Sequence, residues 1–376
     1  MFNLFTVENS IIVTIFVIVV FLINKLYSTN YKVSILFIIF LFIIPSFNTS
    51  ISFINAFNEY IYKSLLTHKE IKINNKKQLH TLYKQNDYNI ILLFGESLRY
   101  DRFKQLEKIS IYKKNTNYKE YKTIALATST DIAIPLFMNN AKQQNEINKN
   151  NSLFKLAKKA NFNTYFISTQ SKKALKHIKE YLNPKYIDYY TQGNKKRYDS
   201  YLIDELKKIN LTKKSFITMQ FTGQHSPYNK YPKEFNQYKN KITLKDKINS
   251  NYNNSVLYTD YIIDKMIRYL QKNSSKPTII VFTSDHGQLL GENNQYGHNT
   301  FKKEVFIVPS FIYTLNINNN LEQKKIIEHL DLVKYIRFQL GYEKEFNFNA
   351  NNISRVNGTM MSGEDGFLNI LRNDFK

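Results

Sequence analysis

The chain has 376 residues, enough for one large α/β domain with an appendage or for two domains. Its net charge is +23, with 46 lysines and only 7 arginines. We interpret most of this charge as solvated surface, with attraction to anionic lipids or glycans as the functional alternative, and the scarcity of arginine disfavours a nucleic-acid partner. The absence of cysteine excludes disulfides, thiol catalysis and cysteine-ligated zinc, so a metal site must use histidine, carboxylate and hydroxyl groups.

Two apolar runs lie near the N-terminus. They cover Ile11–Ile23 and Val33–Phe47, and their flanks extend each run toward the roughly 20 residues that a membrane-spanning helix needs. We predict two transmembrane helices over residues 1–50, with a buried core hairpin as the alternative. Lys25 and Lys32 flank the turn, so the positive-inside rule places the turn in the cytoplasm and the rest of the chain outside.

Residues 51–88 are expected to connect this hairpin to the main domain. Ile54–Leu66 mixes apolar and polar residues, which predicts an amphipathic helix on the membrane surface or a linker helix. Thr67–Tyr88 is polar and rich in lysine and asparagine, as a connector is.

Residues 89–376 alternate short apolar runs with helical stretches. This pattern predicts an α/β domain whose mainly parallel sheet is flanked by helices on both faces. The expected strands are Ile90–Phe94, Thr164–Ser168, Phe216–Phe221, Thr278–Thr283 and Val305–Tyr313. The expected helices are Ser152–Ala160, Lys172–Tyr181, Asp199–Lys208, Ser255–Gln271 and Leu321–Leu340.

Polar residues follow three of the expected strands. Glu96 follows the first, His225 follows the third, and Asp285 and His286 follow the fourth, with His298 in the next loop. Functional residues gather at the carboxyl ends of parallel strands, and carboxylates with imidazoles are ligands of a catalytic zinc or manganese ion. Each motif alone is more often a turn or a helix cap, but together they predict a metal site. The other histidines are interpreted as surface or packing residues: His68, His80, His177 and His329.

A run of hydroxyl residues, Thr128-Ser129-Thr130, precedes an expected short helix. A threonine at a helix N-terminus lies in a positive local field that suits a bound phosphate. A metal ion at its oxygen would lower the hydroxyl pKa and make it a nucleophile. On local sequence alone, a plain helix cap is the favoured interpretation.

Taken together, four segments resemble the alkaline phosphatase/sulfatase superfamily and, within it, the membrane-bound phosphoethanolamine transferases. They are GESLR at Gly95–Arg99, TSTDIAIP at Thr128–Pro135, GQHSPYNKYP at Gly223–Pro232 and SDHGQLLGENNQYGH at Ser284–His298. The resemblance implies one tight zinc site with these ligands: Glu96, Thr130, Asp285 and His286. It also implies that Thr130 is the catalytic nucleophile. His225 and His298 match residues that hold the donor phosphate or a second zinc ion, and Gln170 falls near a substrate-binding segment.

The same resemblance implies an activity. It is the transfer of phosphoethanolamine from phosphatidylethanolamine to a cell-surface glycan or lipid A, through a covalent phospho-threonine intermediate. The protein would be a monomer in the bacterial inner membrane, with residues 89–376 forming a periplasmic catalytic domain. The alternatives are a phosphoglycerol transferase or phosphodiesterase of the same superfamily, or a membrane-anchored glycan-binding protein. A true sulfatase is disfavoured, because no cysteine or serine lies in the C/S-x-P-x-R context that yields formylglycine.

The chain departs from that family in three respects. It has room for fewer membrane helices. The disulfide that brackets the nucleophile in the family is replaced here by Leu126 and Leu136, so packing must replace the crosslink. Gln288 stands where a glutamate commonly follows Asp-His-Gly, which removes one carboxylate from the site.

Overall fold

A mixed eight-stranded sheet forms the centre of the fold, with strand order β10-β2-β9-β6-β1-β5-β3-β4. The computed structural model describes residues 80–105, 110, 112–193, 198–239 and 242–375. The predicted transmembrane hairpin and connector residues 51–79 lie outside these ranges and stay predictions. Among the helices that are described, none combines the length and apolar character needed to cross a bilayer.

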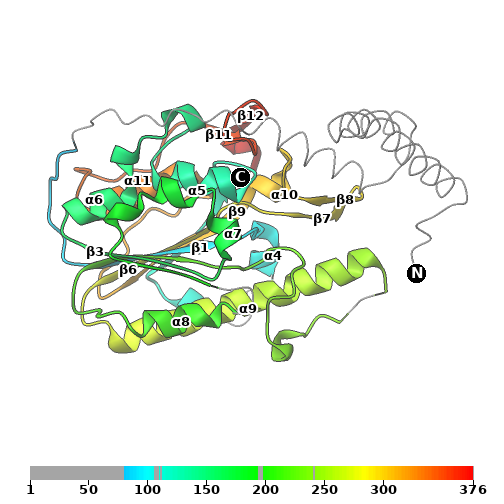
Figure 1. Cartoon of the computed structure of the whole chain (residues 1–376), viewed down its shortest axis with the longest axis horizontal. Helices are drawn as coiled ribbons and strands as arrows, with labels where there is room; N and C mark the ends of the chain where they lie inside the picture. The colour runs from blue at the N-terminus through cyan, green and yellow to red at the C-terminus, as the bar shows by residue number, and fades with distance from the viewer. Residues whose placement is uncertain (1–79, 106–109, 111, 194–197, 240–241, 376) are drawn as a thin grey trace, which may run out of the picture. The chain divides into compact units, whose positions relative to one another are not determined.

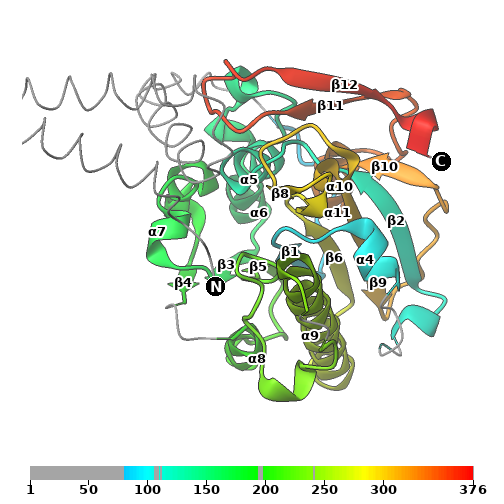
Figure 2. The same cartoon turned by 90° about the vertical axis from the view of Figure 1, so that its right-hand side faces the viewer.

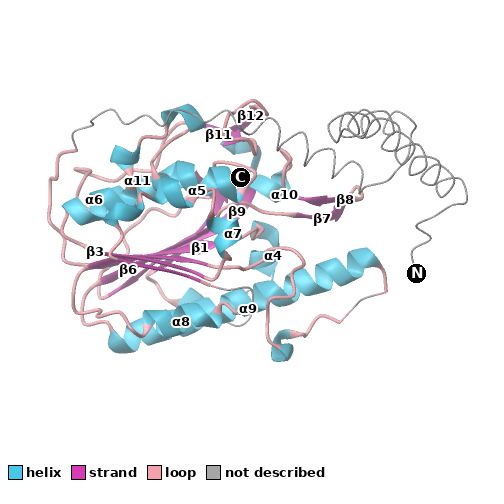
Figure 3. Ribbon diagram, in the orientation of Figure 1, coloured by secondary structure: helices cyan, strands magenta, loops and turns pink. Residues whose placement is uncertain are grey.

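Seven of the eight strands run in one direction, and β9 alone runs against them, paired with β2 and β6. This confirms the mainly parallel sheet expected from the sequence (Figure 3). The strands are β1 Asn89–Gly95, β2 Tyr118–Ile124, β3 Asn163–Ser168, β4 Tyr189–Gln192, β5 Ser215–Gln220, β6 Thr278–Ser284, β9 Ile307–Leu315 and β10 Ile326–Glu328.

Helices cover both faces of the sheet (Figure 1). One face packs against α5 Thr130–Met138, α6 Leu153–Lys159 and α11 His329–Gln339, and the other against α4 Tyr100–Gln105, α8 Ser200–Leu206 and α9 Leu244–Asn273. Because side chains alternate along a strand, Ile90 and Leu92 of β1 enter the first core while Ile91 and Leu93 enter the second. A strand buried on both faces is mainly apolar, as the centres of β1 (Ile90–Phe94) and β6 (Ile279–Phe282) are.

Smaller elements surround this core. Two short helices are α7 Lys172–Leu175 and α10 Lys303–Phe306. Strand β7 Leu289–Glu292 pairs with β8 Gln295–Gly297, and β11 Ile353–Asn357 pairs with β12 Phe367–Leu371. Figure 2 shows β11 and β12 beside the end of the sheet that carries β10 and β2. The 3-10 helices are Tyr112–Lys114, Gln144–Glu146, Lys149–Asn151, Lys179–Leu182, Pro184–Tyr186, Lys233–Phe235 and Arg372–Phe375.

Several expected boundaries were wrong. Residues 303–306 form helix α10, so the strand expected from Val305 begins at Ile307. The expected helix Leu321–Leu340 contains strand β10 and then α11, because Ile326–Glu328 pairs with β2. Helix α7 ends at Leu175 rather than continuing to Tyr181.

Helix α9 begins eleven residues earlier than expected, at Leu244 rather than Ser255. Its first turn is stabilised by a capping box, in which Thr243 accepts from the Asp246 amide and the Asp246 carboxylate accepts from the Thr243 amide. The added turns are polar and project beyond the sheet, on the same side as the β7–β8 hairpin (Figure 1). This extension bears on the surface beside the functional site.

Candidate active site

The carboxyl ends of β1 and β6 bring the predicted metal ligands together. Gly95 of β1 pairs with Ser284 of β6, so the next residues, Glu96 and Asp285, leave adjacent strands side by side. His286 follows directly. All three side chains are almost completely buried, and their ligand atoms lie within 4.8 Å of one another.

Thr130, the first residue of α5, directs its hydroxyl into this group. Its Oγ1 lies 2.6 Å from Asp285 Oδ2, 3.2 Å from Glu96 Oε2 and 3.2 Å from His286 Nε2. A threonine hydroxyl carries one proton, so it can donate to only one of these three acceptors at a time. Three acceptor atoms therefore surround a hydroxyl that has one proton to donate.

The electrostatics of the cluster call for a cation. Burial and the neighbouring Asp285 carboxylate raise the pKa of Glu96 well above its usual value. Among the described residues, no lysine or arginine forms an ion pair with Glu96 or Asp285. The imidazole of His286 lies beside both, with Nε2 3.7 Å from Glu96 Oε1 and 3.5 Å from Asp285 Oδ2. Two buried carboxylates, an imidazole nitrogen and a hydroxyl form a donor set that fits a divalent ion such as zinc.

Neighbouring groups orient each member of the cluster. His286 Nδ1 lies 2.7 Å from the Gly287 carbonyl, which can only accept, so Nδ1 carries the proton and Nε2 presents its lone pair to Thr130. Asp285 Oδ1 accepts the amides of Ser97 and His286, which leaves Oδ2 for Thr130. Gly287 has no room for a side chain, because a Cβ would lie 2.2 Å from the Glu304 carbonyl.

Gln170, predicted near the substrate, contacts the metal cluster itself. Its Nε2 donates to Glu96 Oε2 at 3.0 Å and to the Phe221 carbonyl at 3.1 Å, and the residue also lines the cavity in front of Thr130. It thereby holds the Glu96 carboxylate in place from the end of β3.

The loop that carries Thr130 is held by hydrogen bonds from distant segments. His329 Nδ1 accepts the Leu126 amide at 3.2 Å, and Asn357 donates both its backbone and its side-chain nitrogen to the Leu126 carbonyl. Leu126 and Leu136 both lie in the core on the α5 side of the sheet, which confirms the expected packing. The hydrogen bonds to His329 and Asn357 were not expected, and they add a second means of restraining the loop where the family has a crosslink.

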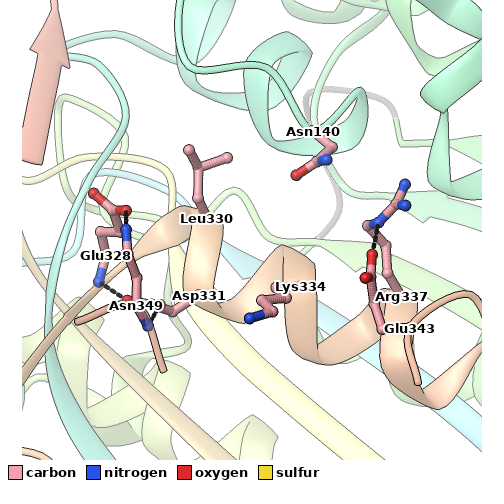
Figure 4. Close-up of a pocket in the computed structure, with 8 residues that line it drawn as sticks. All are labelled: Asn140, Glu328, Leu330, Asp331, Lys334, Arg337, Glu343 and Asn349. Carbon is pink, nitrogen blue, oxygen red and sulfur yellow. Dashed lines mark hydrogen bonds and ion pairs between the residues drawn. The ribbon is translucent and has the colours of Figure 1, made fainter. Parts of the chain in front are cut away.

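His329 is the first residue of α11, and that end of the helix is itself well anchored. Asn349 donates to Glu328 Oε1 and, through its backbone, to Asp331 Oδ1 (Figure 4). Arg372 adds ion pairs to both carboxylates. His329 was interpreted as a surface or packing residue; the structure places it in the core, between the nucleophile loop and β6.

A cavity of about 470 Å³ opens in front of Thr130. His225 and His298 line it, so the structure brings both predicted histidines to the site. His298 packs its ring 4.3 Å from that of His286, centroid to centroid, and its Nδ1 lies 3.0 Å from Gln288 Oε1. Lys173 and His177 also line the cavity. The sequence analysis did not place His177 at the site. The signal that could have found it is its position four residues after Lys173, close to Gln170.

A sulfatase family profile matches residues 88–341, more than half of the chain. The chain belongs to the sulfatase family. Over 113 residues it is 36% identical to phosphoethanolamine transferase EptA of Escherichia coli K12, a stretch that covers 27% of this chain and 21% of that relative. The matched stretch therefore spans only about a fifth of that relative's length.

Solved structures share the fold at low sequence identity. The periplasmic domain of phosphoethanolamine transferase EptC from Campylobacter jejuni superposes with a TM-score of 0.58 at 19% identity, covering 69% of this chain and 92% of that one. The corresponding E. coli EptC domain, in complex with zinc, gives a TM-score of 0.56 at 16% identity and covers 73% and 87%. The described part of the chain thus has the fold of these periplasmic domains.

Asp199 supports the candidate site from behind, and the sequence analysis did not identify it. Its carboxylate accepts from the Thr169 hydroxyl and from the backbone amides of Thr222 and Gly223. It therefore ties the loop after β3, which carries Gln170, to the loop after β5, which carries His225. Burial raises the pKa of Asp199 despite these hydrogen bonds.

Proposed function

We propose that this protein transfers phosphoethanolamine from phosphatidylethanolamine to a surface glycan or lipid A, and that Thr130 carries the group between them. The single observation that supports this most strongly is the Thr130 hydroxyl, which lies within 3.3 Å of Glu96, Asp285 and His286. The similarity to EptA supports the choice of transferred group. Residues 1–50 would hold the protein in the inner membrane, with the catalytic domain in the periplasm.

Glu96, Thr130, Asp285 and His286 would hold one zinc ion. When bound, zinc would supply the positive charge that lowers the pKa of the Thr130 hydroxyl and offsets the charge of the phosphoryl oxygens. Asp285 and His286 orient Thr130 Oγ1 through the contacts described above. Gln170 keeps Glu96 from turning away, as second-layer hydrogen bonds commonly do in metal sites.

The transfer takes two displacements at phosphorus. In the first, Thr130 Oγ1 gives up its proton and bonds to phosphorus, the bond from phosphorus to the diacylglycerol oxygen breaks, and that oxygen takes a proton. In the second, an acceptor oxygen loses its proton and bonds to phosphorus, the bond to Thr130 breaks, and Thr130 Oγ1 takes a proton again. His225 and His298 line the cavity and are placed to give or take these protons or to stabilise the phosphoryl oxygens.

The test uses full-length protein with phosphatidylethanolamine vesicles and no acceptor. We expect diacylglycerol release in a single turnover and a phosphoethanolamine adduct on the peptide that contains Thr130, detected by mass spectrometry. Thr130→Ala should abolish both while zinc content and the circular dichroism spectrum stay close to wild type. Thr212→Ala, at an exposed threonine in the turn before β5, is the matched control. Near-normal turnover by Thr130→Ala would rule out the covalent route.

A further inference from the structure

A second cavity, of about 660 Å³, adjoins the catalytic cavity. We call it the α9 groove, and its walls come from the first turns of α9, the β8 end of the β7–β8 hairpin and the loop after β5. His298 lines both cavities, and the neighbouring residues His225 and Ser226 line one cavity each. The two cavities therefore meet at His298.

The α9 groove is apolar at its base and open to solvent. Leu244 and Ile248 lie four residues apart on one face of α9, and Pro227, Tyr228 and Tyr296 face them. Leu244 remains 59% exposed and Tyr296 45% exposed, and Ile242, just before the helix, is 90% exposed. Exposed apolar side chains that lie together are typical of a surface that binds a partner, a ligand or a membrane.

Lysines surround this apolar surface. Lys239, Lys245 and Lys247 are exposed, and Lys247 lines the groove. The acidic residue on the same turn, Asp246, already accepts hydrogen bonds from Thr243 in the capping box. Apolar side chains next to lysines are typical of surfaces that enter the interfacial region of an anionic membrane.

The groove walls are held firmly. Asn249 of α9 donates to the Leu290 carbonyl of β7 at 3.0 Å, and Arg99 pairs with Glu292 of the same hairpin at 2.5 Å. Gln288, at the junction of the two cavities, donates to the Tyr228 hydroxyl at 2.7 Å and contacts His298 on its other side. The groove is therefore formed before a ligand arrives, which lowers the entropy cost of binding.

We propose that the α9 groove binds the diacylglycerol part of the phospholipid donor, its glycerol and the first methylene groups of its acyl chains. This rests on the proposed function, because it assumes that a phosphodiester lipid reacts at Thr130. Ile242, Leu244 and Tyr296 enter the membrane surface beside the donor, so the lipid need not leave the bilayer completely. A glycan acceptor fits this surface less well, because most of the surface that lines the groove is apolar.

The experiment compares two donors with the same headgroup, using the full chain. One is phosphatidylethanolamine in vesicles, and the other is glycerophosphoethanolamine, which is soluble and has no acyl chains. We expect Leu244→Asp to lower kcat/KM for the lipid about tenfold and for the soluble diester less than about twofold. Leu371→Asp, an identical change at a 49% exposed leucine on β12, is the control and should affect neither substrate. An aspartate at the first position of α9 favours the helix, so folding should be unaffected.

A second measurement does not need turnover. Phosphatidylethanolamine with a photoreactive acyl chain, in vesicles, should label peptides that contain residues 242–251 or 296–299 in both wild type and Thr130→Ala, and not the β12 peptide. Three results would overturn the groove proposal. They are an equal loss of kcat/KM for both donors in Leu244→Asp, no loss of kcat/KM for the lipid in that variant, and no labelling of the groove peptides. Normal lipid cleavage with impaired transfer to the acceptor would assign the groove to the acceptor and also overturn it. Labelling of the groove without cleavage of either donor would leave the groove standing and refute the proposed function.

Discussion

His329 donates its Nε2–H to the carbonyl of Ser284, at 2.9 Å. On its other side, Nδ1 accepts the Leu126 amide from the loop that carries Thr130. One neutral imidazole thus connects the strand that delivers Asp285 to the segment that delivers Thr130. The ring is fully buried, and burial lowers the pKa of His329 to about 4.

This connection predicts a pH-dependent stability. An unfolded histidine has a pKa near 6.5, so between about pH 4 and 6.5 the unfolded chain binds a proton that folded His329 does not. The stabilisation is complete above the unfolded pKa and is lost as the pH falls toward 4. His329→Gln removes the titrating group. The free energy of unfolding of wild type minus that of the variant should therefore fall by about 2 to 3 kcal/mol when the pH is lowered from 7.5 to 4.5.

Urea denaturation at both pH values, followed by tyrosine fluorescence because the chain has no tryptophan, measures this difference. His177→Gln, at an exposed histidine, is the control and should leave the pH dependence as in wild type. A wild-type-to-variant difference that stays constant with pH would contradict the assignment of a neutral buried His329.

Gln170 is predicted to act through Glu96. Removing its amide in Gln170→Leu frees the Glu96 carboxylate, and second-layer changes of this kind lower metal affinity about 10- to 100-fold. Competition titration with a zinc chelator measures the loss. Gln237→Leu, at an exposed glutamine, is the matched control. Unchanged zinc affinity with a raised KM would instead assign Gln170 to substrate binding alone.

Gln288 is predicted to orient His298. Its side-chain oxygen lies beside His298 Nδ1 and can accept a hydrogen bond from a proton on that nitrogen. This contact fixes the ring so that Nε2 points away from Gln288. Gln288→Leu should lower kcat about 10- to 100-fold without loss of zinc, because a misplaced acid–base group removes that much of the rate. Gln288→Glu keeps an acceptor oxygen at the same position and should recover most of it.

Steady-state turnover with phosphatidylethanolamine, alongside zinc analysis, separates these outcomes. Gln295→Leu, on exposed β8, controls for changes to the hairpin. Failure of Gln288→Glu to exceed Gln288→Leu would show that the amide nitrogen and its hydrogen bond to Tyr228 matter instead.

The strands that carry the site were predictable because they are buried on both faces. A central parallel strand is mainly apolar, and β1 and β6 show this as the uninterrupted runs Ile90–Phe94 and Ile279–Phe282, with Glu96 and Asp285 shortly after them. The strand β2 escaped prediction because its half-buried positions hold lysine and glutamate, and β10 because three residues are too few to show a period. The start of α9 was missed because its first turns are polar and lie beyond the core.

The sequence was sufficient to predict which side chains come together at the end of β1 and β6. Glu96, Asp285 and His286 each follow a buried strand, and strand direction alone brings such residues to one edge. The groups that support them depend on the tertiary structure. His329, Asn357 and Asp199 reach the site across 23 to 231 positions of sequence through a few hydrogen bonds, which leave no periodic signal. The α9 groove likewise exists only because a polar helix extension, a hairpin and a loop that are distant in sequence pack against one another.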